Sequence, residues 1–286
     1  MKQSIIFLTL SLILLLSCKN DENKTTQNNK KRQLYGSWQL TKINNVNEKT
    51  KNEGDILAYE AVQQLMVKVG LMYSFFPDSS FTLVDGSGHY ENDRWIFANK
   101  GKNIMLVYKK DTLSVNLKEE NKKLVLQLEN KRKGISMDFI KISDILKNYI
   151  EDPFYPENNL WRIKPDTSEN NDQLQSRLGN YFKHTALLLK AATERKAKEI
   201  SFVYSKGPIQ IYNGGIGIHD SMPEMWSEAY YNIDDATKAY DMFRQYLRTS
   251  QYNGANTGDW FVDDYNILIS IYGDLKSGNF PKVGDN

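Results

Sequence analysis

Cysteine and histidine are the scarcest reactive residues of this 286-residue chain, which holds one cysteine and three histidines. A single cysteine cannot form a disulfide within the chain, and it excludes metal sites built from several thiolates. The net charge is also small, +2 at pH 7. Nucleic-acid binding requires a basic excess that displaces counterions, so we expect no nucleic-acid partner.

Long apolar runs are equally scarce, and the clearest one lies at the N-terminus. Residues 5–16 are apolar apart from Thr9 and Ser11, and they follow the positive charge of Lys2. A helix of that length extends about 18 Å, which is too short for a hydrocarbon core of about 30 Å. The pattern therefore predicts a secretory signal peptide over residues 1–17 rather than a transmembrane helix.

The predicted signal peptide ends in Leu15-Leu16-Ser17-Cys18, which resembles the lipobox of bacterial lipoproteins. The resemblance implies cleavage before Cys18 and acylation of that cysteine, which would anchor the protein to a membrane. Lys19 stands where an aspartate would resemble the inner-membrane retention signal, so we expect the outer membrane, on its periplasmic or cell-surface face. The alternative is an ordinary signal peptide with a chance cysteine. Residues 18–32 lack apolar side chains after Cys18, which predicts a flexible tether.

Residues 33–142 are predicted to form a small antiparallel β-barrel. Apolar and polar residues alternate in short runs, and turn sequences separate the runs at intervals of about 8–12 residues, as in sandwiches and barrels. Residues 55–69 instead have helical spacing, so we expect a helix that covers one end or edge of the barrel. The predicted strands are Tyr35–Ile43, Leu71–Phe76, Phe81–Asp85, Asp93–Ala98, Asn103–Lys109, Thr112–Leu117, Lys123–Glu129 and Ile135–Ile142.

Gly36 and Trp38 lie in the first of these strands, and their Gly-x-Trp spacing resembles the opening strand of lipocalin-like proteins. The hairpin at residues 76–81 and the strand at residues 94–97 are similar to those of bacterial lipocalin-like domains. The resemblance implies an eight-stranded up-and-down barrel with Trp38 packed at its closed end.

The arginine that covers this tryptophan in the family is not identifiable here, and Lys141 or Arg132 would have to take its place. Small barrels of eight strands are either filled by their own side chains or hold a small ligand. We favour a filled barrel, in which Trp38 and Trp95 belong to the core.

The pattern changes near residue 143. Residues 143–167 are predicted to be a connector, and residues 168–286 an acidic, aromatic-rich domain of four or five helices with one hairpin near Asn213-Gly214. The fold class is therefore α+β, an eight-stranded antiparallel lipocalin-like β-barrel followed by a mainly α-helical domain with one β-hairpin. This second half resembles no family that we identify. Helices are expected at residues 144–151 and 172–198, and from residues 221, 232 and 259 onward.

One cluster offers candidate catalytic residues: His219, Asp220, Glu224 and Glu228. If a helix begins near Pro223, both glutamates share one face beside the histidine, an arrangement that suits acid–base hydrolysis or an oxygen-ligated metal. The simpler interpretation is structural, because Glu224 completes a capping box with Ser221. We favour the structural interpretation, so a non-enzymatic role is preferred, and no metal or other cofactor is predicted.

Tyrosine and tryptophan gather in the second half of the chain. Trp226, Tyr230, Tyr231 and Trp260 flank the apolar stripes, so we expect some of these rings to be exposed beside carboxylates. Exposed rings of this kind suit protein partners or sugars. The leading hypothesis is therefore an outer-membrane, surface-exposed or periplasmic lipoprotein that binds an envelope protein or glycan. A lipid-anchored hydrolase and a structural or toxin-neutralising envelope protein are the alternatives.

Overall fold

The computed structural model forms two compact units. The first comprises residues 1–50, 75–80 and 93–145, and the second comprises residues 51–74, 81–92 and 146–286. The described residues are 28–45, 60–61, 64–68, 70–86, 90–98, 103–108, 111–130, 132, 134–197, 229–249 and 257–278.

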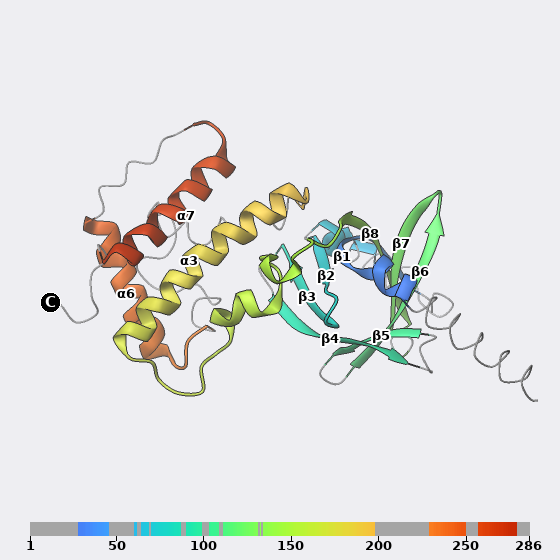
Figure 1. The fold of residues 1–286 in the computed structure, drawn as a ribbon, viewed down its shortest axis with the longest axis horizontal. Coiled ribbons are helices and arrows are strands. Elements are labelled where there is room, and N and C mark those ends of the chain that lie inside the picture. The colour runs from blue at the N-terminus through green and yellow to red at the C-terminus, as the bar shows by residue number, and fades with distance from the viewer. Residues whose placement is uncertain are drawn as a thin grey trace, which may run out of the picture. The chain divides into compact units, whose positions relative to one another are not determined.

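Eight antiparallel strands close into a barrel in chain order, and β8 returns to pair with β1 (Figure 1). This architecture confirms the eight-stranded barrel predicted from the sequence. Closure leaves no free strand edge that would pair with another chain. The strands are β1 (Gly36–Asn45), β2 (Leu71–Phe75), β3 (Ser80–Asp85), β4 (Tyr90–Ala98), β5 (Asn103–Tyr108), β6 (Asp111–Glu120), β7 (Lys123–Asn130) and β8 (Ile135–Ser143).

Apolar side chains from neighbouring strands meet in layers inside the barrel. Leu40 of β1 pairs with Phe139 of β8, which in turn pairs with Leu126 of β7. All three side chains are at most 3% exposed. Burial of such a side chain stabilises the fold by roughly 1.5–3 kcal/mol. The alternation seen in the sequence of β7 therefore corresponds to a buried inner face.

The Gly-x-Trp motif lies at the start of β1, where it packs against the residues before the strand and against β8. Trp38 is fully buried, and its Nε1 donates a hydrogen bond to the carbonyl oxygen of Leu34 at 2.7 Å. Gly36 has a φ of +115°, and a Cβ at this position would lie 2.2 Å from the carbonyl oxygen of Ser143. Only glycine fits here, because the backbone conformation and the close approach of β8 both exclude a side chain.

The cation that covers the tryptophan is Lys141. Its Nζ lies 5.7 Å from the centre of the Trp38 ring and 2.7 Å from a carboxylate oxygen of Asp144. Lys141 pairs directly with Trp38 in the β1–β8 ladder, which brings the two side chains to the same face. Arg132, the other candidate, is exposed between β7 and β8.

Residues 28–34 form a helix ahead of β1. Leu34 is fully buried, and the Nζ of Lys31 lies 5.3 Å from the centre of the Phe97 ring. Part of the segment predicted to be a flexible tether is therefore helical and packs on the first unit. Of the helix predicted at residues 55–69, the described residues 60–61 and 64–68 are helical.

Strands β2 and β3 are buried on both faces over residues 72–75 and 81–84. The hydroxyl of Thr82 on β3 donates a hydrogen bond to the carbonyl oxygen of Phe154 at 2.6 Å. Phe154 is itself fully buried in the connector. This hydrogen bond joins β3 to the connector within the second unit, although β3 also completes the barrel.

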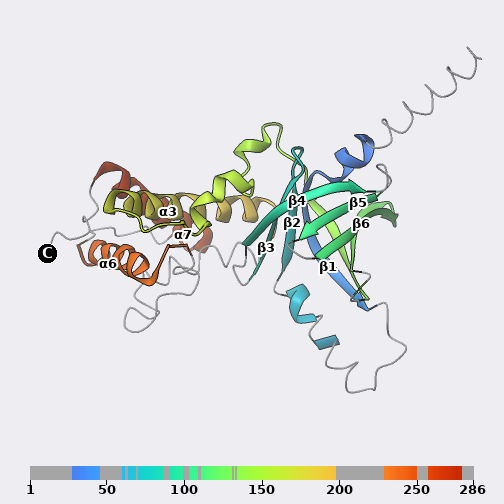
Figure 2. The same cartoon turned by 90° about the horizontal axis from the view of Figure 1, so that it is seen from below.

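The described helices of the second unit pack through apolar stripes. Helix α3 begins at a capping box, in which Asn170 accepts from the backbone N–H of Gln173 and Gln173 accepts from that of Asn170. It lies beside α7 in both views (Figures 1 and 2). Its predicted stripe is buried at Leu174, Leu178, Phe182, Leu188 and Leu189. The longer helices are α3 (Asn171–Glu194), α6 (Ile233–Thr249) and α7 (Trp260–Ser277).

The connector differs from the sequence-based prediction in its local structure. Only Tyr149–Glu151 (η3) of the short helix expected at residues 144–151 is helical, as a 3₁₀ turn. Pro156–Arg162 (η4), predicted to be part of the irregular connector, forms two 3₁₀ turns that are separated by a kink at Asn159. Proline suits the first turn of a helix. The predicted hairpin near Asn213-Gly214 and the helix expected from residue 221 lie outside the described residues.

Candidate functional site

The candidate catalytic residues predicted from the sequence lie outside the described residues: His219, Asp220, Glu224 and Glu228. Cys18 and Trp226 lie outside them as well. Trp260 begins α7, but the orientation of its side chain is not described. Tyr230 and Tyr231 are therefore the two predicted contact residues whose side chains are placed.

Tyr230 and Tyr231 differ sharply in exposure, although they are adjacent in the chain. Tyr230 is 2% exposed, and burial raises the pKa of its hydroxyl, with a smaller contribution from nearby Tyr181. Tyr230 is therefore a core residue and does not offer the exposed ring that the sequence suggested. Tyr231 is 40% exposed and keeps a ring surface open to solvent.

Tyr231 lines an open hollow of about 680 Å³ in the second unit. One wall comes from the end of the connector and the other from the residues that precede α6. The hollow is open to solvent over most of its boundary. The lining residues are Lys164, Pro165, Asp166, Tyr231 and Asn232.

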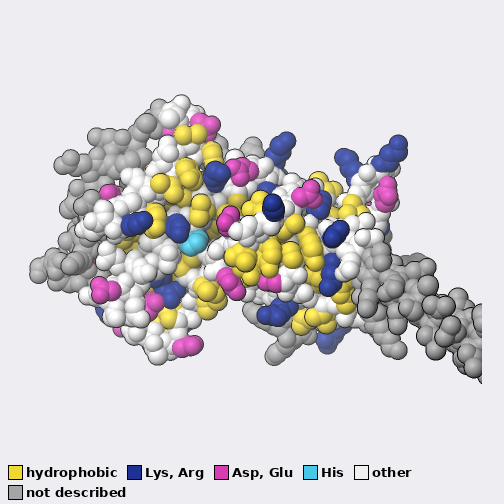
Figure 3. All heavy atoms as spheres, in the orientation of Figure 1, with side chains coloured by type: hydrophobic (Ala, Val, Ile, Leu, Met, Phe, Trp, Pro, Cys, Tyr) yellow, Lys and Arg dark blue, Asp and Glu magenta, His cyan; other side chains and the backbone are white. Residues whose placement is uncertain are grey.

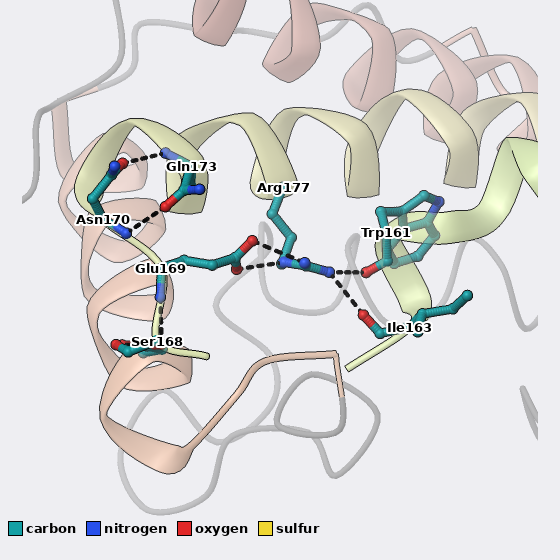
Figure 4. Close-up of polar contacts among 8 residues, drawn as sticks. Trp161, Ile163, Ser168, Glu169, Asn170, Gln173 and Arg177 are labelled. Atoms are coloured by element: carbon teal, nitrogen blue, oxygen red, sulfur yellow. Dashed lines mark hydrogen bonds and ion pairs between the residues drawn. The ribbon is translucent and has the colours of Figure 1, made fainter. Parts of the chain in front are cut away.

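The wall that the connector contributes, Lys164–Asp166, is stabilised by Arg177 of α3 (Figure 4). Arg177 contacts the backbone before this wall and a carboxylate after it. The Nε and one terminal nitrogen of Arg177 contact the two carboxylate oxygens of Glu169 at 2.6 and 2.9 Å. The other terminal nitrogen donates to the carbonyl oxygens of Trp161 and Ile163 at 2.6 and 3.2 Å. This bidentate pair, which is largely buried, fixes the backbone on both sides of Lys164–Asp166.

Asp235 joins the two walls of the hollow. Its carboxylate, which is fully buried, accepts hydrogen bonds from the hydroxyl of Ser168 at 2.8 and 2.9 Å and from the backbone N–H of Glu169 at 3.1 Å. Asn232, in the opposite wall, accepts from the backbone N–H of Asp235 at 2.8 Å. The walls are therefore pre-organised, which lowers the entropic cost of binding a ligand between them.

The lining groups are mostly polar and exposed. Lys164 and Asp166 are both exposed, and neither forms an ion pair or hydrogen bond with another residue in the described part of the chain. Ile163 and Ile233, which adjoin the two walls, are 53% and 60% exposed. The hollow thus combines one aromatic ring, one proline, two charged groups and one amide.

His184 on α3 is the one histidine among the described residues, and it is not one of the residues that line the hollow. Its pKa is lowered to about 4, because burial disfavours the charged imidazolium and Lys183 adds a like charge. Its buried Nδ1 has no hydrogen-bond partner among the residues that the structure places. Within those residues no group of three or more His, Cys, Asp or Glu side chains is arranged to hold a metal ion.

The surface charge of the described residues is mixed. Figure 3 shows basic and acidic side chains interspersed among apolar ones on the face that it draws. That face therefore does not present the continuous basic surface that nucleic-acid binding requires. None of the described helices is both long and apolar enough to cross a membrane.

Comparisons with known proteins find no matching family model and no matching curated protein. Among solved structures, a DUF4847 family protein from Bacteroides vulgatus is 14% identical, over 37% of this chain and 92% of that chain, with a TM-score of 0.26. As-p18, an extracellular fatty acid binding protein, is 11% identical, over 38% of this chain and 96% of that chain, with a TM-score of 0.23.

A third solved structure is the Schistosoma mansoni fatty acid binding protein in complex with arachidonic acid. It is 11% identical, over 38% of this chain and 96% of that chain, with a TM-score of 0.22. At such low identities and TM-scores, none of the three structures assigns a ligand or an activity to this chain.

Proposed function

We propose that this protein is a lipid-anchored binding protein of the bacterial outer membrane, and that the hollow around Tyr231 is its binding site. The observation that carries the proposal is an exposed tyrosine in a hollow whose two walls are held in place by a largely buried ion pair and by hydrogen bonds. Pre-organised walls around an aromatic ring are typical of binding sites. The lipid anchor rests on the Leu15-Leu16-Ser17-Cys18 sequence.

The groups that line the hollow favour binding over catalysis. They comprise one carboxylate, one ammonium group, one amide and one phenol. Hydrolysis by the usual routes needs a nucleophile or water-activating base paired with a second acid–base group. Asp166 is the one carboxylate that lines the hollow, and no histidine, cysteine, serine or second carboxylate lines it as well.

The test is capture of envelope components by the mature, lipid-anchored protein, followed by mass spectrometry of proteins and glycans. We expect a specific component that is retained by the native protein and lost with Tyr231→Ala. Ile96→Ala is the matched control, because Ile96 is 46% exposed on β4 of the barrel. Equal capture by the native protein and Tyr231→Ala would contradict the assignment of the hollow.

The anchor is tested separately by Cys18→Ala. We expect this variant to lose incorporation of labelled fatty acid and to leave the outer-membrane fraction. Unchanged labelling would show that Cys18 is not the acylated residue.

A further inference from the structure

We infer that the ligand of the Tyr231 hollow is a glycan, recognised through the tyrosine ring and the polar groups of the two walls. The inference rests on the proposed function, since it names the ligand class of the same site. It follows from the size of the hollow, from the electrostatics at the start of α6, and from the chemistry of the lining residues.

The size of the hollow favours a small or narrow ligand over a protein surface. Stable protein–protein interfaces engage about 20–30 residues on each side. Five residues line this hollow. A ligand that inserts a few polar rings fits this space better than a folded partner does.

The start of α6 disfavours an anionic ligand. A helix N-terminus usually attracts anions through its free N–H groups and its dipole. Here Asn232 already accepts the N–H of Asp235, and the first turn carries the carboxylates of Asp234 and Asp235. Asp166 adds a third carboxylate nearby in the wall. Two ammonium groups oppose these three carboxylates, Lys164 in the wall and Lys238, which lies 3.7 Å from Asp235. The balance remains negative, so phosphate and carboxylate ligands are disfavoured.

The remaining chemistry matches a neutral polyol. The ring of Tyr231 offers an exposed apolar face, on which the C–H face of a sugar can pack while its hydroxyls point toward polar groups. Asp166 accepts hydrogen bonds, Lys164 donates them, and the amide of Asn232 has both kinds of group. Because Lys164 and Asp166 are free of ion pairs within the described residues, neither charge has to be separated from a partner before the ligand binds.

The experiment uses the mature, full-length lipoprotein in detergent micelles on an array of neutral, amino-sugar and acidic oligosaccharides, followed by calorimetric titration of the best neutral binder. We expect retention of neutral or amino-sugar oligosaccharides and at least a tenfold weaker Kd for Tyr231→Ala. Tyr231→Phe keeps the ring, so its Kd should stay within about threefold of the native value. Asp166→Asn keeps the shape of the wall but removes the charge, and we expect a smaller weakening.

The possible outcomes separate this inference from the proposed function. If no oligosaccharide is retained, or if retention does not depend on Tyr231, the glycan inference is overturned. If the glycan array fails while envelope capture still depends on Tyr231, the hollow is a binding site for another ligand class. If capture is also independent of Tyr231, both proposals fail. Thermal melting of each variant shows that lost binding does not reflect unfolding.

Discussion

The guanidinium of Arg195 and the carboxylate of Asp152 form an ion pair 2.5 Å apart in the interior of the second unit. Arg195 follows the end of α3, and Asp152 lies in the connector. The guanidinium also lies 4.8 Å from the centre of the Phe154 ring, and the backbone N–H of Phe154 donates to Asp152. Since Phe154 accepts from Thr82, the pair links the end of α3 through the connector to β3.

Loss of one partner of this pair should strongly destabilise the protein. Arg195→Ala leaves the Asp152 carboxylate buried without its counter-charge, which costs about 3–5 kcal/mol. Chemical denaturation measures the change in the free energy of unfolding. The matched control is Glu194→Ala, which breaks an exposed i,i+4 pair with Lys190 and should cost at most about 0.5 kcal/mol. Equal effects of the two substitutions would show that the buried pair has no special role.

Substitution of two glycines by alanine should change the stability of the protein in opposite directions. Gly36→Ala places a Cβ against the carbonyl oxygen of Ser143 at a positive φ, so we expect a loss of several °C in Tm or failure to fold. Gly273→Ala in α7 meets nothing within 4 Å and should raise the stability by about 0.5–1 kcal/mol. Thermal melting of both variants checks the prediction. A tolerated Gly36→Ala would mean that β1 can shift away from β8.

Asp235 should matter for both stability and binding. Asp235→Ala removes the shared acceptor of the Ser168 hydroxyl and of the Glu169 N–H, two part-buried hydrogen bonds that each contribute about 0.5–1.5 kcal/mol to stability. The walls of the hollow also lose their link, so capture of the ligand should weaken. Asp234→Ala is the control, because Asp234 is exposed in the same helical turn. Chemical denaturation measures the loss of stability, and envelope capture measures the loss of ligand binding. We expect both losses for Asp235→Ala and neither for Asp234→Ala.

His184 should make the stability depend on pH in the acidic range. Its pKa is about 4 in the folded protein and near 6.5 in an unfolded chain. Between these values the unfolded state binds more protons, so the free energy of unfolding falls as the pH is lowered from about 6.5 toward 4. His184→Gln removes this contribution, and its Tm should fall less than the native Tm over that range. Parallel Tm curves for the two proteins would contradict the prediction.

The barrel was predictable from the sequence because its signals are local. Alternating residues on β6 and β7 and closely spaced turns define the strands without knowledge of their partners, and Trp38 and Trp95 are buried as expected. The sequence could not show that Lys141, rather than Arg132, covers the ring of Trp38. That contact depends on the register of β1 against β8, which pairs Lys141 with Trp38.

The candidate site was predictable only in part. Tyr231 stood among the candidate aromatic residues, but Tyr230 and Tyr231 precede α6, where no helical or strand period separates a buried ring from an exposed one. The hydrogen bonds of Asp235 join residues 66 and 67 positions apart, and they arise only from tertiary packing. Two acids at the start of a predicted helix gave no sign that one of them would be fully buried.

The helix at residues 28–34 sets a limit on how far the protein reaches from its anchor. With Cys18 acylated as proposed, only residues 19–27 separate the lipid from a segment packed on the first unit. Even a fully extended chain over that interval spans no more than about 35 Å. The acylated protein would therefore keep its first unit next to the bilayer surface, because the segment between the lipid and that unit is short.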